Sequence, residues 1–247
     1  MDCVQYGIAM GRYKTLSIVI PTYNEEKYIV ETVRKVKKAD VCGLIKEIIV
    51  VDDGSTDQTL KKIKLISKKS KIIVIEKKRN EGKAAALKLG FLKSSGDIVL
   101  IQDADLEYNP DDYLALLEPF LKNKADVVYG SRFISDRPHR VLYFWHYLAN
   151  VFLTTLSNML TNLNLTDMET GYKVFRGDLI REVAKKIKSK RFGFEPEITA
   201  RVAKIEAIRI YEVGISYWGR TYAEGKKINL IDGIKALGEI IKYNLFD

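Results

Sequence analysis

The sequence is poor in the residues that build several common kinds of site. Its 247 residues include two cysteines, Cys3 and Cys42, and two histidines, His139 and His146. Two cysteines exclude a small fold held by a disulfide framework, and no Cys/His cluster has the spacing of a zinc site. Neither histidine follows a predicted strand, so a Ser-His-Asp hydrolase is also poorly supported.

Long apolar runs and linkers are also scarce. No window reaches the roughly 18 to 20 unbroken apolar residues that a membrane-spanning helix needs, and the N-terminus lacks the apolar core of a signal peptide. The chain has 5 prolines and no Gly/Ser/Pro-rich stretch. We therefore expect one domain over residues 1–247, with residues 1–15 as an N-terminal extension.

Two nucleotide-binding motifs are missing. No Gly-x-Gly-x-x-Gly follows the first predicted strand, which argues against a dinucleotide-dependent dehydrogenase. Gly82-Lys83 has neither the first glycine nor the following Ser/Thr of a P-loop.

The charge balance is basic, with 41 Lys+Arg against 32 Asp+Glu and a net charge of +9. Such an excess suits an anionic partner, which is nucleic acid, an acidic membrane surface or a phosphorylated substrate. Many lysines lie within residues 61–93, where helical spacing is typical of a solvated face. A non-catalytic nucleic-acid-binding protein is a remote alternative, because the sequence has no recognisable binding module.

The first half of the chain alternates β-branched apolar runs with segments of helical length. The runs lack polar alternation, as strands buried on both faces do. This alternation predicts βαβ units and a parallel sheet. The runs are residues 16–20, 47–51, 71–75, 97–101 and 126–129, and the helical segments are roughly 26–38, 57–69, 83–95 and 110–123.

The second half is less regular. Its pattern predicts helices at about 139–163, 178–188, after Pro196 and at 230–243, with strands at 170–176 and 208–213.

Two aspartates, Asp103 and Asp105, follow the fourth predicted strand one residue apart. Ligands of open parallel sheets bind beyond the carboxyl ends of the strands, and a shared Mg²⁺ or Mn²⁺ would remove the repulsion between the two carboxylates. Glu107 is close enough to assist as a third ligand. Because Mg²⁺ completes its shell with water and phosphate oxygens, the pair implies a diphosphate ligand.

A second acidic turn follows the second predicted strand. A capped turn would fully explain Gly54, Ser55 and Asp57. It does not explain Asp53, whose carboxylate can accept hydrogen bonds from a base N–H or from ribose hydroxyls.

Six segments together resemble the family 2 glycosyltransferases, specifically the dolichyl- or polyprenyl-phosphate hexose synthases. The match runs from residue 16 to 227, and its segments are IVIPTYNEE, VVDDGSTD, NEGKAAAL, QDADLEYNP, VVYGSRF and DMETGYKVFR. The resemblance implies an α/β fold of the nucleotide-diphospho-sugar transferase (glycosyltransferase A) type, a mostly parallel central sheet with helices on both faces. It also implies a nucleotide-sugar-binding half, about 16–132, and an acceptor and lipid-side half, about 133–247.

The resemblance also implies site residues and a divalent metal, Mg²⁺ or Mn²⁺. Asp103 and Asp105 would bind ribose and the metal-diphosphate, and Arg132 and Arg220 would neutralise phosphates. The segment GRTYAEGKKI is similar to the family's C-terminal Arg/Lys loop, in which Lys226 or its neighbour Lys227 would act. The residues implied at the donor are Pro21, Tyr23, Glu25, Asp53, Lys83 and Lys226.

The acceptor decides the mechanism. A lipid monophosphate is already ionised near pH 7 and can attack unaided, which predicts one in-line displacement with inversion. A sugar or polysaccharide hydroxyl would need a general base, for which Glu195 is the candidate. The other interpretation of Glu195 and Glu197 is a helix N-terminus with Pro196 in its first turn.

A charge-free run at 141–166 bears on the lipid. Its apolar residues form a stripe at helical spacing, with polar residues opposite. The helix either packs on the sheet or lies in a membrane interface beside Arg137 and Arg140. We expect peripheral association with the cytosolic membrane face. The expected donor is UDP-glucose, UDP-N-acetylglucosamine or GDP-mannose, and the resemblance slightly favours a UDP donor. The stripe comprises Val141, Trp145, Leu148, Phe152, Leu156, Met159 and Leu163.

Overall fold

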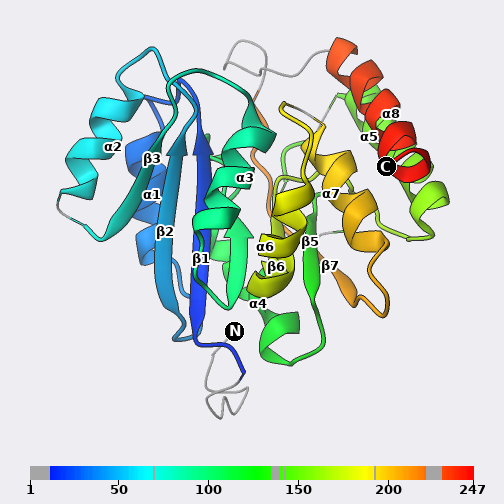
Figure 1. Ribbon diagram of the computed structural model, residues 1–247, viewed down its shortest axis with the longest axis horizontal. Helices are drawn as coiled ribbons and strands as arrows, with labels where there is room; N and C mark the ends of the chain where they lie inside the picture. The colour runs from blue at the N-terminus through cyan, green and yellow to red at the C-terminus, as the bar shows by residue number, and fades with distance from the viewer. Residues whose placement is uncertain (1–11, 69, 135–138, 142, 192, 221–229) are drawn as a thin grey trace.

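A computed structural model describes residues 12–247 except 69, 135–138, 142, 192 and 221–229. Its strands form one seven-stranded sheet in the order β3-β2-β1-β4-β6-β5-β7 (Figure 1). The strands are β1 (Thr15–Thr22), β2 (Ile45–Asp52), β3 (Ile72–Glu76), β4 (Ile98–Ile101), β5 (Val127–Ser131), β6 (Lys173–Arg176) and β7 (Ile210–Gly214).

Helices fill the connections where the sequence predicts them. A short 3-10 turn, η2 (Pro110–Asp112), precedes α4, and the Asn109 side chain accepts the Asp111 N–H as the expected cap. Helix α5 starts later than predicted, because the backbone of Arg140 donates to the carbonyl of Tyr217 instead. The helices are α1 (Ile29–Lys38), α2 (Thr59–Ser67), α3 (Lys83–Lys93), α4 (Tyr113–Leu121), α5 (Phe144–Thr161), α6 (Gly177–Lys186), α7 (Phe194–Ala203) and α8 (Leu230–Leu245).

The sheet is mostly parallel, as predicted. Strand β6 is the exception, since it pairs antiparallel with both β4 and β5. The expectation that all five early strands are buried on both faces is wrong for β3. This strand lies at the edge of the sheet, so Ile73 is 42% exposed.

Successive side chains along the central strands point alternately into two apolar layers, one on each face of the sheet. Ile18 and Ile20 point to the layer that includes residues of α1, α2 and α4, whereas Val19 points to the layer that includes residues of α3, α6 and α7. Helices α3, α6 and α7 lie on the near face in Figure 1. Helices therefore cover both faces, as predicted, and leave the carboxyl ends of β1, β2 and β4 at one edge of the sheet.

Helix α5 lies beside α8 and contacts α7 (Figure 1). Its buried side chains are Leu153, Thr154 and Ser157. Most of the predicted apolar stripe therefore does not pack inward, although Leu156 and Leu163 are partly buried. Within the described ranges, no helix combines the length and the apolarity needed to cross a bilayer. The exposed stripe residues are Val141, Trp145, Leu148, Phe152 and Met159.

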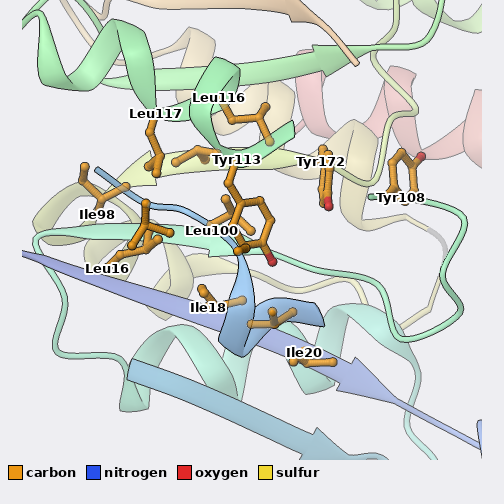
Figure 2. Close-up of a cluster of buried hydrophobic side chains, with 14 of the residues drawn as sticks. Leu16, Ile18, Ile20, Ile98, Leu100, Tyr108, Tyr113, Leu116, Leu117 and Tyr172 are labelled. Carbon is orange, nitrogen blue, oxygen red and sulfur yellow. The ribbon is translucent and has the colours of Figure 1, made fainter. Parts of the chain in front are cut away.

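A buried glutamine, Gln102, anchors the end of β4. Its Oε1 accepts hydrogen bonds from the hydroxyls of Tyr113, at 2.7 Å, and Tyr172, at 2.8 Å. Its Nε2 donates to the carbonyl oxygens of Asp103 and Tyr108. Figure 2 shows the three tyrosines among the apolar side chains of this layer. Gln102 thus ties both ends of the loop after β4 to the core.

We expect Gln102→Leu to lower the free energy of unfolding by about 2–4 kcal/mol, because buried hydroxyl and carbonyl groups lose a partner. Urea unfolding measures this change. Tyr113→Phe is the matched control, since it removes one hydroxyl and should cost about 1 kcal/mol. Equal unfolding free energies for Gln102→Leu and the wild type would contradict this role.

Candidate active site

The loops that follow β1 and β2 are joined by side-chain hydrogen bonds. Asn24 donates its N–H to Ser55 Oγ, at 3.0 Å, and its Oδ1 accepts the Thr56 N–H, at 2.8 Å. Glu25 donates its N–H to Thr59 Oγ1. These bonds fix the loop in which two of the predicted nucleoside-binding residues, Tyr23 and Glu25, follow Pro21 of β1.

Asp53 is buried at the end of β2 and links two loops. Its carboxylate forms an ion pair with Lys77 and accepts the N–H groups of Gly82, at 2.7 Å, and Glu81, at 3.1 Å. The next residue, Gly54, has a φ of 71°, and a Cβ there would lie 2.7 Å from the backbone of the loop after β3. Only glycine suits this turn.

Lys83 joins two carboxylates that are far apart in sequence. Its Nζ lies 3.0 Å from Asp103 Oδ1 and 3.2 Å from Glu195 Oε1. Lys83 begins α3, and Glu195 lies in the first turn of α7. Burial alone would lower the pKa of Lys83, but the charges of Asp103 and Glu195 raise it above its ordinary value. The ammonium group therefore stays charged between them.

Arg220 joins the other carboxylates of the site. Its Nη2 lies 2.6 Å from Asp105 Oδ2, and its Nε lies 2.9 Å from Glu107 Oε1. Its Nη1 is 3.8 Å from Glu25 Oε2. The second oxygen of Glu107 accepts the hydroxyl of Tyr217 at 2.7 Å. Glu107 thus orients Arg220 and Tyr217.

The donor set after β4 fits a divalent metal. Burial, and then the charges of Asp103 and Glu107, raise the pKa of Asp105 to about 7, against the effect of Arg220. Negative charge is therefore only partly compensated here. Among the residues that the structure describes, no three His, Cys, Asp or Glu side chains lie together as metal ligands. Mg²⁺ needs only one or two protein carboxylates, because water and phosphate oxygens complete its shell. Asp103 and Asp105 could supply these carboxylates.

Arg132, after β5, is held by a buried carboxylate. Its Nε and Nη2 donate to the two oxygens of Asp167 at 2.6 and 2.7 Å. Burial alone would lower the pKa of Arg132, but Asp167 raises it well above the ordinary value. The guanidinium carbon lies 5.4 Å from the centre of the Phe133 ring and 5.2 Å from that of Tyr217. Arg132 is therefore a fixed cation.

These groups form one connected set. Tyr217 contacts both Arg132 and Glu107, and Gly82, whose N–H binds Asp53, directly precedes Lys83. Selected acidic and basic residues thus lie together where the ends of β1, β2, β4 and β5 meet the starts of α3 and α7 and the segment after β7. They are Glu25, Asp53, Lys83, Asp103, Asp105, Glu107, Arg132, Glu195 and Arg220.

Glu195 and Glu197, which the sequence leaves undecided, have different surroundings. Glu197 is fully buried and accepts the N–H groups of Lys188 and Ser189, with Arg201 as its ion-pair partner. It anchors the loop before α7. Glu195 instead faces Lys83. Of the two glutamates, only Glu195 therefore belongs to the ion-pair set, by which we mean Lys83, Arg220 and their carboxylate partners.

The loop before β6 lies close to the acidic loop, which is the loop after β4 that carries Asp103, Asp105 and Glu107. A Cβ on Gly171 would lie 2.3 Å from Asp103 Oδ2, and the Gly171 N–H donates to the Tyr108 hydroxyl at 2.8 Å. Lys173 is buried, and its ammonium group donates to the carbonyl oxygens of Met168 and Thr170. The backbone of this loop is therefore fixed against Asp103.

Several residues of the site are missing from the sequence-based selection. Gln102 and Asp167 stand inside the quoted segments QDADLEYNP and DMETGYKVFR, so these motifs already contained them. Lys77 directly follows β3, so a search of the polar residues after each predicted strand could have selected it. Tyr217 carries no local signal. The predicted Lys226 lies outside the described residues.

Comparisons with known proteins agree with this geometry. The family model described as glycosyl transferase family 2 matches residues 17–184. A UDP-N-acetylglucosamine–dolichyl-phosphate N-acetylglucosaminyltransferase of Methanococcus voltae is 26% identical over 238 residues, covering 90% of this chain and 93% of the relative. The dolichol-phosphate mannosyltransferase of Pyrococcus furiosus is 38% identical over 119 residues, 48% of this chain and 33% of the relative.

Solved structures share the fold. Glucosyl-3-phosphoglycerate synthase from Mycobacterium tuberculosis, in complex with Mn²⁺, UDP and phosphoglyceric acid, superposes with a TM-score of 0.73 at 20% identity. The match covers 100% of this chain and 84% of that one. The predicted family and fold are confirmed: the chain belongs to glycosyl transferase family 2 and is a glycosyltransferase with the glycosyltransferase A fold.

Proposed function

We propose that this glycosyltransferase moves a hexose from a nucleotide-sugar to dolichyl or polyprenyl phosphate at the cytosolic membrane face, as a peripheral membrane protein. Residues from about 16 to 132 would form most of the donor side and residues from about 133 to 247 most of the acceptor side. Arg132, at the boundary, would reach the acceptor, and Arg220 of the second half would reach the donor. The names of the two relatives from Methanococcus voltae and Pyrococcus furiosus support a dolichyl-phosphate acceptor.

The position of Arg132 beside exposed apolar side chains is the observation that supports a lipid phosphate best. The Phe133 ring, next to Arg132, packs edge-on against Tyr147 of α5 with ring centres 5.2 Å apart. Arg132 is thus one aromatic layer away from the α5 surface. We define the α5 surface as the exposed side chains of Tyr143, Phe144, Trp145, Tyr147, Leu148 and Phe152.

This juxtaposition matches the two ends of the proposed acceptor. A guanidinium group binds a phosphate, whereas exposed aromatic and aliphatic side chains enter the boundary between headgroups and acyl chains. Arg140, which precedes α5 in the chain, also lies near the site, because its Nη1 donates to the carbonyl of Gly219, next to Arg220. A lipid lying on the α5 surface could therefore present its phosphate to Arg132.

The residues of the site would divide the work of a single displacement. Arg132 would hold the acceptor phosphate, whose charged oxygen attacks the anomeric carbon without a protein base. Lys83 and Arg220 would turn from their carboxylate partners to the negative charge that develops on the departing nucleoside diphosphate. Pro21, Tyr23, Glu25 and Asp53 would hold the nucleoside.

Asp103 and Asp105 would hold the divalent metal. When bound there, Mg²⁺ or Mn²⁺ would neutralise the diphosphate oxygens and so stabilise the leaving group. Structural neighbours from Mycobacterium tuberculosis bind Mn²⁺ or Mg²⁺ together with UDP, which supports this part of the proposal and a UDP donor.

A hydroxyl acceptor is the main rival, and one observation favours it. The Glu195 carboxylate is buried within the ion-pair set, one lysine away from Asp103. A carboxylate there could act as a general base on a sugar hydroxyl. Acceptor profiling with polyprenyl phosphates and with free sugars distinguishes the two enzymes.

We expect Glu195→Gln to keep kcat within about tenfold of the wild type with a short polyprenyl phosphate acceptor, because an ionised phosphate needs no base. Loss of a general base would cost about 10²–10⁴-fold. Steady-state turnover with each nucleotide-sugar measures the change.

We expect NMR of the product to show an inverted anomeric centre, because the proposed mechanism is one displacement. A retained centre would contradict the single displacement.

We expect the double variant Trp145→Ser/Phe152→Ser to bind acidic lipid vesicles at least about tenfold more weakly, because each large apolar side chain contributes about 1.5–3 kcal/mol when buried. Vesicle flotation measures retention. The control is Leu65→Ser, which removes a side chain of α2 that is 61% exposed. Equal retention of the double variant and the control would count against the α5 surface as the membrane contact.

A further inference from the structure

Glu169 is a partly buried residue to which the proposed mechanism gives no role. Its Oε1 is shielded from solvent and has no hydrogen-bond partner among the described residues. The same holds for Oγ1 of the next residue, Thr170, which is 0% exposed. An unpaired buried oxygen costs about 1–3 kcal/mol. Such a cost is expected where a ligand supplies the missing partner.

The loop that carries Glu169 places it between two parts of the site. Asp167, two residues before Glu169, binds Arg132, and Gly171, two residues after it, packs against Asp103. The charge of Glu195, which Lys83 connects to Asp103, also acts on the carboxyl group of Glu169. Glu169 thus lies between the acidic loop and the cation that we assign to the acceptor phosphate.

The transferred sugar must occupy the same interval. In an in-line displacement the anomeric carbon lies between the departing diphosphate, at Asp103, and the attacking phosphate, at Arg132. The loop between these two groups carries Glu169, whose Oε1, like Oγ1 of Thr170, has no hydrogen-bond partner in the described part of the chain. A hydroxyl group of the hexose is the donor that this position would meet.

The backbone around Glu169 is fixed before any ligand binds. Lys173 donates to the carbonyl oxygens on both sides of Glu169, those of Met168 and Thr170, and Gly171 packs against Asp103. A fixed acceptor discriminates between ligands better than a mobile one, because little ordering accompanies binding.

We propose that Glu169 binds a hydroxyl group of the transferred hexose and thereby selects donors that carry this hydroxyl. The inference rests on the proposed function, since it needs a nucleotide-sugar donor. Burial, and then the charge of Glu195, raise the pKa of Glu169 to about 8, with Lys173 opposing them. A carboxyl group near its pKa can donate as well as accept, as a sugar hydroxyl does.

Kinetics with monodeoxy analogues of the active nucleotide-sugar test this role. We expect one deoxy analogue to lose about 10²-fold or more in kcat/KM with the wild type, because the site is built to bond that hydroxyl. Glu169→Ala should lower kcat/KM for the parent donor by a similar factor and abolish the difference between parent and analogue. The affinity of Glu169→Ala for the nucleoside diphosphate alone, measured by calorimetry, should stay within about twofold of the wild-type affinity.

Two further variants keep the test decisive. Glu169→Gln retains an acceptor oxygen in the same shape and should keep part of the discrimination, and it carries the test where Glu169→Ala does not fold. Glu182→Gln changes an exposed carboxylate of α6 and is the matched control.

The inference is wrong if the wild type shows no hydroxyl-specific loss, or if both Glu169 variants discriminate as the wild type does. It is also wrong if these variants lose affinity for the nucleoside diphosphate along with turnover, since Glu169 would then only support the fold of the site. A wild type that transfers no hexose from any nucleotide-sugar overturns the proposed function instead.

Discussion

Charge compensation at the end of β4 is the interaction on which the site depends. Asp103, Asp105 and Glu107 lie within one short loop, and their mutual repulsion would favour solvent. Lys83 and Arg220 remove part of this repulsion through ion pairs of 2.6–3.0 Å. The two cations come from α3 and from the segment after β7, so the acidic loop draws distant parts of the chain together.

The same ion pairs help to hold the surrounding loops. Their side chains are only 14–25% exposed, so breaking a pair would leave a poorly solvated charge. The neighbouring backbone is accordingly fixed by Gln102 at the end of β4 and by the close approach of Gly171 to Asp103. A diphosphate with its metal carries the charges needed to exchange partners with Lys83 and Arg220. The site thus holds its groups in place before the donor arrives.

Local patterns in the sequence were enough to predict the strands, the edge that carries the site and most charged residues of that edge. β-branched runs such as residues 47–51 specify strands, and polar residues after them must lie at the carboxyl edge of a parallel sheet. Partners could not be predicted in this way. The pairing of Arg132 with Asp167, and of Asp53 with Lys77, depends on how loops meet in three dimensions.

The orientation of α5 shows the same limit. Its apolar stripe is equally compatible with a packed and an exposed face, because periodicity gives the sides of a helix and not the side that is covered. In the structure the inward side is centred on Leu153, Thr154 and Ser157, and the aromatic residues stay exposed. Strand β6 is a comparable case, since a run of four residues carries no signal for its antiparallel direction.

Crystals grown with Mn²⁺ and the nucleoside diphosphate, with data collected at the manganese absorption edge, test the central claim most directly. The account predicts an anomalous peak bound by Asp103 or Asp105 and by diphosphate oxygens, with Lys83 or Arg220 turned to the phosphates. A nucleotide that binds elsewhere, while both cations keep their carboxylate partners and no manganese touches the acidic loop, would contradict it.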